Sequence, residues 1–236
     1  MVNISDQIGI FVPARLNSHR LPNKQILPIG NTCMFEICCK KLQCITQYYG
    51  INTYVLICDD ELLEIAHKYP GVQVVLRDKD TAEAEGPLLY IYKDILDVST
   101  KFLVFLNPCL IFLSVETIVN KIKEFLTSGK DYGTSVKTLQ NWVWNNQWEL
   151  ISEINFQRLT TKEIEPLYQC AHCFHIFNRE SFKKDGYMLK EDLTLLEIPE
   201  EETVDIDTYH DYLYAKWLWG EVSEEKIERI FSPCDI

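Results

Sequence analysis

Cationic side chains gather in one short stretch near the N-terminus. Between Asp6 and Glu36 the chain has no acidic residue, although 35 acids in 236 residues would place about four there. The same stretch carries Arg15, Arg20 and Lys24. Guanidinium groups bind phosphate oxygens in pairs, and an ammonium can follow a leaving phosphate. The stretch therefore suits a polyphosphate ligand, with a solvated basic turn as an equal alternative on composition alone.

Two carboxylates stand close together near the C-terminus. Residues 203–208 alternate polar and apolar side chains, so in an extended segment Asp205 and Asp207 project to one side. Thr208 followed by Asp211 resembles a capping box, which predicts a helix beginning just after Asp207. Such a pair suits Mg²⁺, which takes one or two carboxylates plus substrate phosphates. Without further context, solvated acids at a strand end are the simpler interpretation.

The elements that must position these groups are typical of an α/β protein. Short apolar runs predict buried strands at residues 8–12, 54–58, 72–76 and 102–106. Apolar spacings of three and four predict helices at residues 34–45, 60–69, 87–96 and 115–126. This alternation indicates βαβ units and a mainly parallel sheet. Ligands then gather at the carboxyl ends of the strands, directly before the basic stretch.

The pattern changes after about residue 131. Residues 132–139 and 142–154 are rich in β-branched and aromatic side chains without helical spacing, and 171–177 is another candidate strand. Residues 209–219 predict a final helix, and the acidic cluster 197–202 predicts a solvated loop. We interpret Trp142, Trp144 and Trp148 as core or subunit-interface residues. One α/β domain over residues 1–236 with a small β-rich insertion is expected.

Charge and composition exclude several classes of protein. A formal charge of −12 argues against extended nucleic-acid binding. No signal peptide is visible, and the longest apolar run, about residues 102–113, is shorter than the roughly 20 residues of a membrane span. We therefore expect no membrane association and a cytoplasmic location. The nine cysteines are then expected to be reduced thiols.

The order of residues in the basic stretch is more specific than its composition. It contains neither the GxxxxGK(S/T) nor the GxGxxG pattern. Residues 13–24 read PARLNSHRLPNK and closely resemble the PARxxSxRxPxK signature of CMP-sugar cytidylyltransferases, most of all the branch that activates 3-deoxy-manno-octulosonate. The resemblance implies that this loop wraps the CTP phosphates, with Arg15 and Lys24 contacting them. The nucleotide-binding residues that it implies here are Ala14, Arg15, Ser18, Arg20, Lys24 and Gln25.

Further segments resemble the sialate-type members of this family. Residues 204–215 follow the pattern VDIDxxxDxxxA, which implies that Asp205 and Asp207 hold the catalytic magnesium and that Asp207, with Arg15 and Lys24, is catalytic. Arg77 and the segment beginning at Asp80 resemble a stretch that shapes the nucleotide pocket. After the fourth strand, the family's QPTSPLR is replaced by NPCLIFL. Asn107 can still offer an amide to the cytosine or ribose, but the hydroxyls and the arginine are missing.

The resemblance covers nearly the whole chain and implies a three-layer Rossmann-like nucleotidyltransferase fold. It implies transfer of CMP from CTP to an acidic sugar, sialic-acid-like or 3-deoxy-octulosonate-like, with Mg²⁺ and release of pyrophosphate. Because the family commonly forms dimers, a homodimer through residues at about 140–170 is expected. Two alternatives stay open: transfer to a non-sugar acid or phosphonate, and a catalytically silent nucleotide-binding relative.

A cluster of potential zinc ligands lies at Cys170, His172, Cys173 and His175. In a regular strand residues 172 and 173 face opposite sides, so all four cannot converge. The sequence also has no second ligand pair with metal spacing. We therefore expect packed core and pocket residues, with His172 or His175 lining the sugar site.

Overall fold

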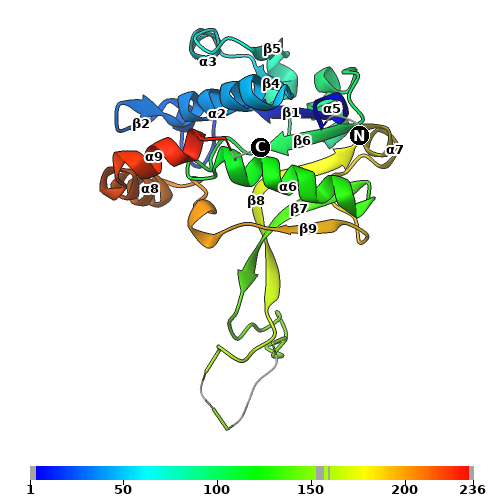
Figure 1. Cartoon of the computed structure of the whole chain (residues 1–236), viewed down its shortest axis with the longest axis vertical. Helices are drawn as coiled ribbons and strands as arrows, with labels where there is room; N and C mark the ends of the chain where they lie inside the picture. The colour runs from blue at the N-terminus through cyan, green and yellow to red at the C-terminus, as the bar shows by residue number, and fades with distance from the viewer. Residues whose placement is uncertain (1–3, 153–156, 159, 234–236) are drawn as a thin grey trace.

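The computed structural model describes residues 4–152, 157–158 and 160–233. Within these residues, seven strands form one central sheet (Figure 1). Their order is β5-β4-β1-β6-β8-β7-β9. The bounds are β1 Ile8–Pro13, β4 Asn52–Ile57, β5 Val72–Leu76, β6 Phe102–Leu106, β7 Tyr132–Leu139, β8 Leu167–Asn178 and β9 Thr194–Glu197. Neighbouring strands are parallel except where β8 pairs with β6 and β7. The mainly parallel sheet predicted from the sequence is confirmed.

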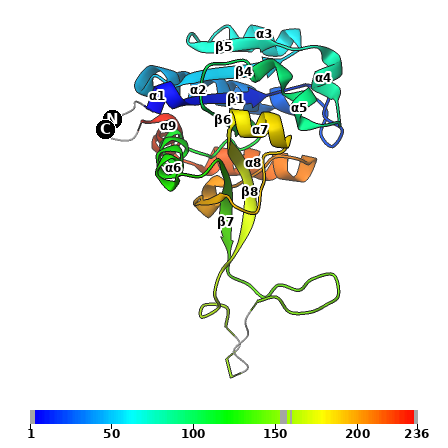
Figure 2. The ribbon, with the colours of Figure 1, turned by 90° about the vertical axis from the view of Figure 1, so that its right-hand side faces the viewer.

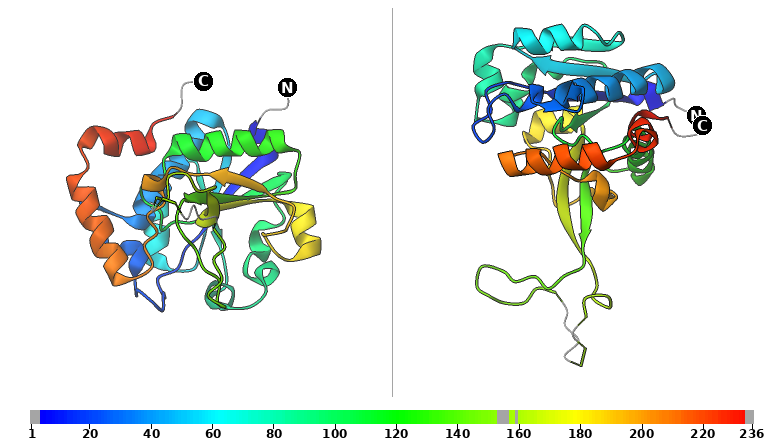
Figure 3. Two further views of the ribbon diagram at one scale, coloured as in Figure 1. Left: turned by 90° about the horizontal axis from the view of Figure 1, so that it is seen from below. Right: turned by 90° about the vertical axis from the view of Figure 1, so that its left-hand side faces the viewer.

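Helices cover both faces of this sheet, which makes the fold three-layered as predicted. Ile10 of β1 points into a core cluster with α2 (Met34–Tyr49), α3 (Asp60–Ala66) and α6 (Val115–Ser128). The next residue, Phe11, enters a second cluster with α5 (Leu88–Ile91) and α7 (Arg179–Asp185). Figure 3 shows α6 on one side of the sheet and α5 and α7 on the other. Because β1 is buried on both faces, its sequence is a continuous apolar run.

The helix expected over residues 87–96 is divided. It consists of α5 and the 3₁₀ turn η2 (Lys93–Ile95), with Tyr92 at the junction in a non-helical conformation. The Tyr92 ring packs edge-on against Phe11, with 5.3 Å between centroids, and lies 5.9 Å from Phe105. Packing of this ring against the sheet thus overrides the local helical pattern.

The remaining elements are short, apart from the final helices. Residues 209–221 form α8 (Tyr209–Glu221), which begins after Thr208 with the predicted capping box. The others are α1 Ile4–Gln7, η1 Lys24–Ile26, β2 Pro28–Ile29, β3 Thr32–Cys33, α4 Lys79–Glu83, η3 Glu200–Glu202 and α9 Glu224–Phe231. A helix with the length and apolar character of a membrane span is absent from the described residues.

The ends of β7 and β8 project from the body together with the described residues between them, and we call this part of the chain the arm (Figures 1 and 2). The β-rich expectation for residues 142–154 is wrong where the structure describes them, because the isolated bridge between Trp144 and Leu150 is the only strand-like pairing there. Asn145 explains this, since its side chain accepts hydrogen bonds from the backbone amides of Gln147 and Glu149, both at 2.9 Å. Residues 153–156 and 159 lie outside the described residues.

The arm also corrects the core interpretation of its tryptophans. Trp144 is 52% exposed and Trp148 is 86% exposed, so neither packs in a core of this chain. Trp142 is half-buried. Their alternative interpretation, a subunit interface, stays a prediction.

The acidic cluster at residues 197–202 is not uniformly solvated, contrary to expectation. Glu202 accepts hydrogen bonds from the backbone amide of Ser114 at 2.8 Å and from the hydroxyl of Thr117 at 2.9 Å. Ser114 is the N-cap of α6. The carboxylate of Glu202 is therefore placed at a helix N-terminus, where a negative charge is stabilising.

A buried lysine supports the loop that follows β6. The Lys41 ammonium, on the inner face of α2, donates to the carbonyl oxygens of Leu110 at 3.0 Å and Ile111 at 2.7 Å. Burial lowers the pKa of Lys41 to about 8. The loop held in this way begins at Asn107, beside the predicted nucleotide site.

Lys41 should make the stability of the protein rise at alkaline pH. The folded pKa of about 8 lies below the ordinary value of 10.5, so between these values the unfolded chain holds more protons than the folded chain. The contribution of Lys41 to the free energy of unfolding should therefore increase over this range, by up to about 1.4 kcal/mol per pH unit. Lys41→Met should remove this increase in denaturant titrations from pH 7 to 10.5. Lys40→Met, which changes an exposed neighbour, should retain it, and equal slopes in both variants would contradict the assignment.

Candidate active site

The loops after β1, β5 and β6 leave the sheet at one edge, because these strands run in the same direction. The Ala14 amide donates to the Leu56 carbonyl at 3.1 Å, and the Arg77 amide donates to the Ile57 carbonyl at 3.0 Å. The loops enclose a pocket of about 330 Å³, which we call the basic pocket. The predicted nucleotide residues on its lining are Ala14, Arg15, Ser18, Arg20, Lys24, Gln25, Arg77 and Asn107.

A second pocket, of about 500 Å³, adjoins the basic pocket. Both pockets are lined by Arg20, Tyr92, Phe105 and Asn107. The lining particular to the second pocket includes His172, His175, Tyr187, Met188, Asp205 and Asp207. We call it the acidic pocket, after its two aspartates. His172 and His175 both face this pocket, and the expectation that one of them lines the sugar site stays a prediction.

The basic loop and the paired aspartates meet where the two pockets join. Lys24 Nζ lies 3.0 Å from Asp207 Oδ1, and Arg20 Nη2 lies 2.9 Å from Asp207 Oδ2. Lys24 and Asp207 are 183 positions apart in the chain. The structure thus brings together two stretches that the sequence places at opposite ends.

Buried apolar side chains hold these two stretches in contact. Leu21, which follows Arg20, and Ile206, which lies between the aspartates, belong to one buried cluster with Tyr212 of α8. Figure 3 shows α8 beside the blue segment that follows β1. Because Ile206 is fully buried, the alternation of the extended segment turns Asp205 and Asp207 toward the pocket.

The contact with Asp207 keeps Lys24 charged. Burial lowers the pKa of Lys24, but Cys109 and Asp207 raise it more, and the net pKa lies above the ordinary value. Burial raises the pKa of the Cys109 thiol, so this thiol is neutral at physiological pH. At this pH the carboxylate of Asp207 is therefore the charged partner that stabilises the ammonium.

Asp205 has fewer hydrogen-bonding partners than Asp207 among the described residues. Burial, and then the charge of Asp207, raises the pKa of Asp205, while Lys24 opposes this effect. Its Oδ1 atom is buried and has no hydrogen-bond partner among the described residues. An unpartnered buried carboxylate oxygen is costly and is a ligand that Mg²⁺ prefers. The two aspartates therefore have the chemistry of a hard-cation site.

Residues 9–212 of the chain match a family model described as cytidylyltransferase. The chain belongs to the cytidylyltransferase family. A curated relative, the pseudaminic acid cytidylyltransferase of Campylobacter jejuni subsp. jejuni serotype O:2, is 18% identical over 224 residues, which cover 89% of this chain and 94% of the relative.

Solved structures share this cytidylyltransferase fold at low sequence identity. CMP:2-keto-3-deoxy-manno-octonic acid synthetase, solved with CTP, superposes with a TM-score of 0.64 at 13% identity and covers 91% of this chain and 99% of its own. The 4-diphosphocytidyl-2C-methyl-D-erythritol synthase of Anaerococcus prevotii superposes with a TM-score of 0.63 at 13% identity, covering 92% and 99%. These similarities establish the fold of the chain.

Two arginines of the basic pocket of this cytidylyltransferase are held by backbone carbonyls. Arg15 Nη1 donates to Ala82 O at 2.9 Å, and Arg77 Nη2 donates to Ala14 O at 3.4 Å. Asp80, predicted to shape the nucleotide pocket, is exposed and lines neither pocket. The reason is that Thr81 and Ala82 form the buried side of α4, which turns Asp80 to solvent.

The side chain of Asn107 also bridges two parts of the backbone, a role that the sequence did not indicate. Its Nδ2 atom donates to the His172 carbonyl at 3.1 Å, and its Oδ1 atom accepts from the Cys109 amide at 3.0 Å. These bonds fix the wall that the two pockets share. One N–H and one lone pair of the amide remain for a ligand.

The aromatic part of the same wall was missed in the sequence. Tyr92 and Phe105 line both pockets, and the Phe105 ring stacks 5.8 Å from that of His175. Phe105 is the penultimate residue of β6. Ligands of parallel sheets bind at the carboxyl ends of the strands, so this position in the sequence could have identified Phe105 as a pocket residue. Burial, and then His172, lowers the pKa of His175 to about 4, so this ring is neutral at physiological pH.

Proposed function

We propose that this protein transfers CMP from CTP to an acidic sugar and releases pyrophosphate. The observation that carries the proposal is the pairing of Lys24 and Arg20 with Asp207 at the junction of two pockets. Cytidylyl transfer requires a bound triphosphate and a bound acceptor to meet at the α-phosphorus. Two adjoining pockets with a shared wall provide that arrangement.

The basic pocket is the proposed CTP site. Arg15, Arg20 and Lys24 would bind the phosphate oxygens and stabilise the charge that develops on the leaving pyrophosphate. In the structure two of these cations are paired with Asp207. We expect Arg20 and Lys24 to transfer their hydrogen bonds to phosphate when the nucleotide binds.

Asp205 and Asp207 are the proposed magnesium ligands. The unpartnered buried oxygen of Asp205 supports this assignment. Magnesium bound there would neutralise charge on the α-phosphate and lower the pKa of the attacking hydroxyl. In the transfer itself, the acceptor oxygen bonds to the α-phosphorus, the bond from that phosphorus to the bridging oxygen breaks, and pyrophosphate leaves with the electron pair. The hydroxyl proton passes to solvent.

The acidic pocket is the proposed acceptor site. Its volume of about 500 Å³ lies in the range of pockets that enclose small ligands. Arg20 supplies hydrogen-bond donors on its lining, and His172 and His175 lie on the same lining. The similarity to enzymes named for pseudaminic acid and for 2-keto-3-deoxy-manno-octonic acid supports a sugar acid as the acceptor.

A homodimer through the arm is also part of the proposal. The arm exposes Trp144, Trp148 and Ile151, the last by 53%. Aromatic side chains of this kind are enriched at the centres of interfaces. We retain the cytoplasmic location expected from the sequence as part of the same proposal.

Pyrophosphate release with defined acceptors tests the function. With CTP and Mg²⁺, we expect release in the presence of pseudaminic acid, sialic acid or 3-deoxy-manno-octulosonate, and none with neutral hexoses. If pyrophosphate is released with a phosphonate and with none of the sugar acids, the sugar acceptor is contradicted, but the protein is still a nucleotidyltransferase. Absence of release with every acceptor would contradict the enzyme assignment and favour a silent nucleotide-binding relative.

A further inference from the structure

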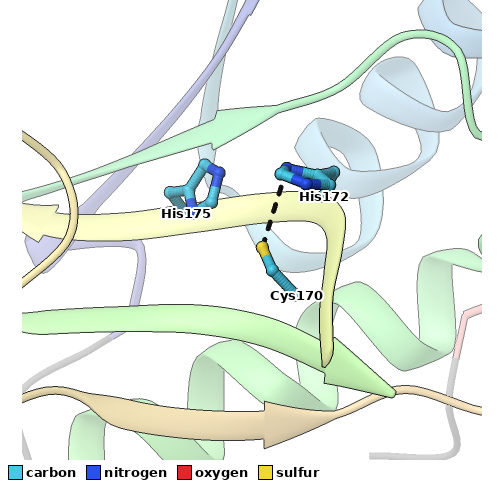
Figure 4. A group of neighbouring side chains, drawn as sticks. All are labelled: Cys170, His172 and His175. Carbon is cyan, nitrogen blue, oxygen red and sulfur yellow. Dashed lines mark hydrogen bonds between the residues drawn. The ribbon is translucent and has the colours of Figure 1, made fainter. Parts of the chain in front are cut away.

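Three potential metal ligands converge beside the acidic pocket, where the sequence predicted packed core and pocket residues without a metal. Cys170, His172 and His175 each place one ligand atom within 4.8 Å of the other two (Figure 4). Cys173 does not join them, because its side chain is fully buried and its thiol donates to the Ala171 carbonyl at 3.6 Å. The expectation that all four could not converge is correct, but it did not anticipate convergence of three.

An irregularity in β8 brings the three side chains together. Thr134 pairs with His175, and Val136 pairs with Cys170. The chain therefore advances by two residues on β7 and by five residues on β8 between the same two pairs, so β8 carries three extra residues. His172 lies within this bulge with a φ of 54°, a left-handed conformation that is uncommon for a residue other than glycine. In a regular strand residues 172 and 175 would face opposite sides. Figure 4 shows β8 bending sharply at this place.

The left-handed conformation of His172 in this bulge is energetically unfavourable. Left-handed backbone at a non-glycine residue costs about 1–3 kcal/mol and persists only where the surrounding structure maintains it. The Ser135 hydroxyl maintains it here by accepting hydrogen bonds from the amides of Cys173 at 2.9 Å and Phe174 at 3.1 Å. Bulges of this kind commonly redirect a side chain beside a functional site.

The separations within the cluster suit a tetrahedral metal. Cys170 Sγ and His172 Nδ1 are 3.6 Å apart, and a tetrahedral zinc centre with ordinary bond lengths separates sulfur and nitrogen by about 3.6 Å. The Thr134 hydroxyl lies 2.8 Å from His175 Nδ1. A hydrogen bond to one ring nitrogen is the usual means of orienting a histidine whose other nitrogen binds a metal.

We propose that Cys170, His172 and His175 form a binding site for a divalent zinc-class metal ion, with one coordination position open to the acidic pocket. Thiolate and imidazole ligands favour such a metal over magnesium, which the carboxylates of Asp205 and Asp207 favour. Both histidines line the acidic pocket, so an oxygen of water or of a bound anion is the fourth ligand. Binding releases the thiol proton of Cys170 to solvent.

Zinc binding by the full-length protein without an affinity tag or substrates tests the site. We expect one equivalent of Zn²⁺ in competition with a chromophoric chelator. Cys170→Ser and His172→Ala should each weaken this binding by at least about 100-fold, since loss of an orienting partner alone costs 10–100-fold. Cys44→Ser, at a half-buried thiol of α2, should leave it unchanged. Equal affinity in Cys170→Ser and Cys44→Ser, with both variants folded by circular dichroism, would overturn the site.

Three further measurements separate this site from the aspartate pair, identify the thiolate ligand and locate the open coordination position. Asp205→Asn should retain tight zinc binding, and loss of zinc there would assign the ion to the aspartates instead. The Co²⁺ form should show a thiolate-to-metal absorption band that is missing in Cys170→Ser. Azide should shift the ligand-field bands of the Co²⁺ form, whereas an unchanged spectrum would show that the protein fills every coordination position.

Discussion

Asp207→Asn is expected to lower the kcat of CTP-dependent pyrophosphate release by about 10²–10³-fold while the fold is retained. Asp207 is the partner of both Lys24 and Arg20 and a proposed magnesium ligand. Asparagine has nearly the same shape but no charge, so both tasks are lost. A continuous pyrophosphate assay with CTP and a sugar-acid acceptor measures the effect.

Asp207→Asn should affect the binding of CTP differently from its turnover. Without Mg²⁺, CTP affinity measured by calorimetry should not weaken, because Lys24 and Arg20 lose a competing anion and remain free to bind phosphate. Glu201→Gln is the matched control, since Glu201 is an exposed acid of the preceding turn and lines neither pocket. Activity of Asp207→Asn within tenfold of the wild-type value would refute the assigned role.

Asp205→Asn is expected to change activity and stability in opposite directions. Activity should fall by about 10²-fold or more, because the unpartnered carboxylate oxygen proposed to bind Mg²⁺ is lost. Stability at neutral pH should rise, because burial and Asp207 raise the pKa of this group and its ionised form is held at a cost. We therefore expect a higher Tm than that of the wild type in thermal denaturation at pH 7.

The sign of the stability effect can be followed with pH. A raised folded pKa means that the ionisation penalty is absent below the ordinary value of 3.8 and complete above the folded value. The Tm difference between Asp205→Asn and the wild type should therefore be present at pH 7 and disappear near pH 4. A variant less stable than the wild type at pH 7 would contradict this explanation.

Asp211→Asn provides a control of opposite sign. Burial of the Asp211 carboxylate works against its ionisation, but hydrogen bonds from Thr208 and the Asp207 amide outweigh it and lower the pKa. The ionised group therefore stabilises the fold above pH 3.8, and this contribution is lost as pH falls through the folded pKa. Asp211→Asn should accordingly lower Tm at pH 7.

Short-range patterns in the sequence determine many of the helices and strands of this protein. The apolar run at residues 102–106 coincides with β6, and the capping residues Thr208 and Asp211 begin α8 where predicted. Such features depend on neighbours within a few positions, so periodicity and capping chemistry reveal them. The order of residues 13–24 likewise indicated the family that the match to residues 9–212 establishes.

Contacts between distant residues were decided by the tertiary structure alone. The sequence marked Lys24 and Asp207 as chemically active, but only the buried cluster of Leu21, Ile206 and Tyr212 places them 3.0 Å apart. Asp80 resembled a pocket residue, and the packing of α4 turns it to solvent. The convergence of Cys170 with the two histidines depends on three extra residues in β8 opposite β7. A bulge of this kind depends on pairing with another strand, so no local period of the sequence records it.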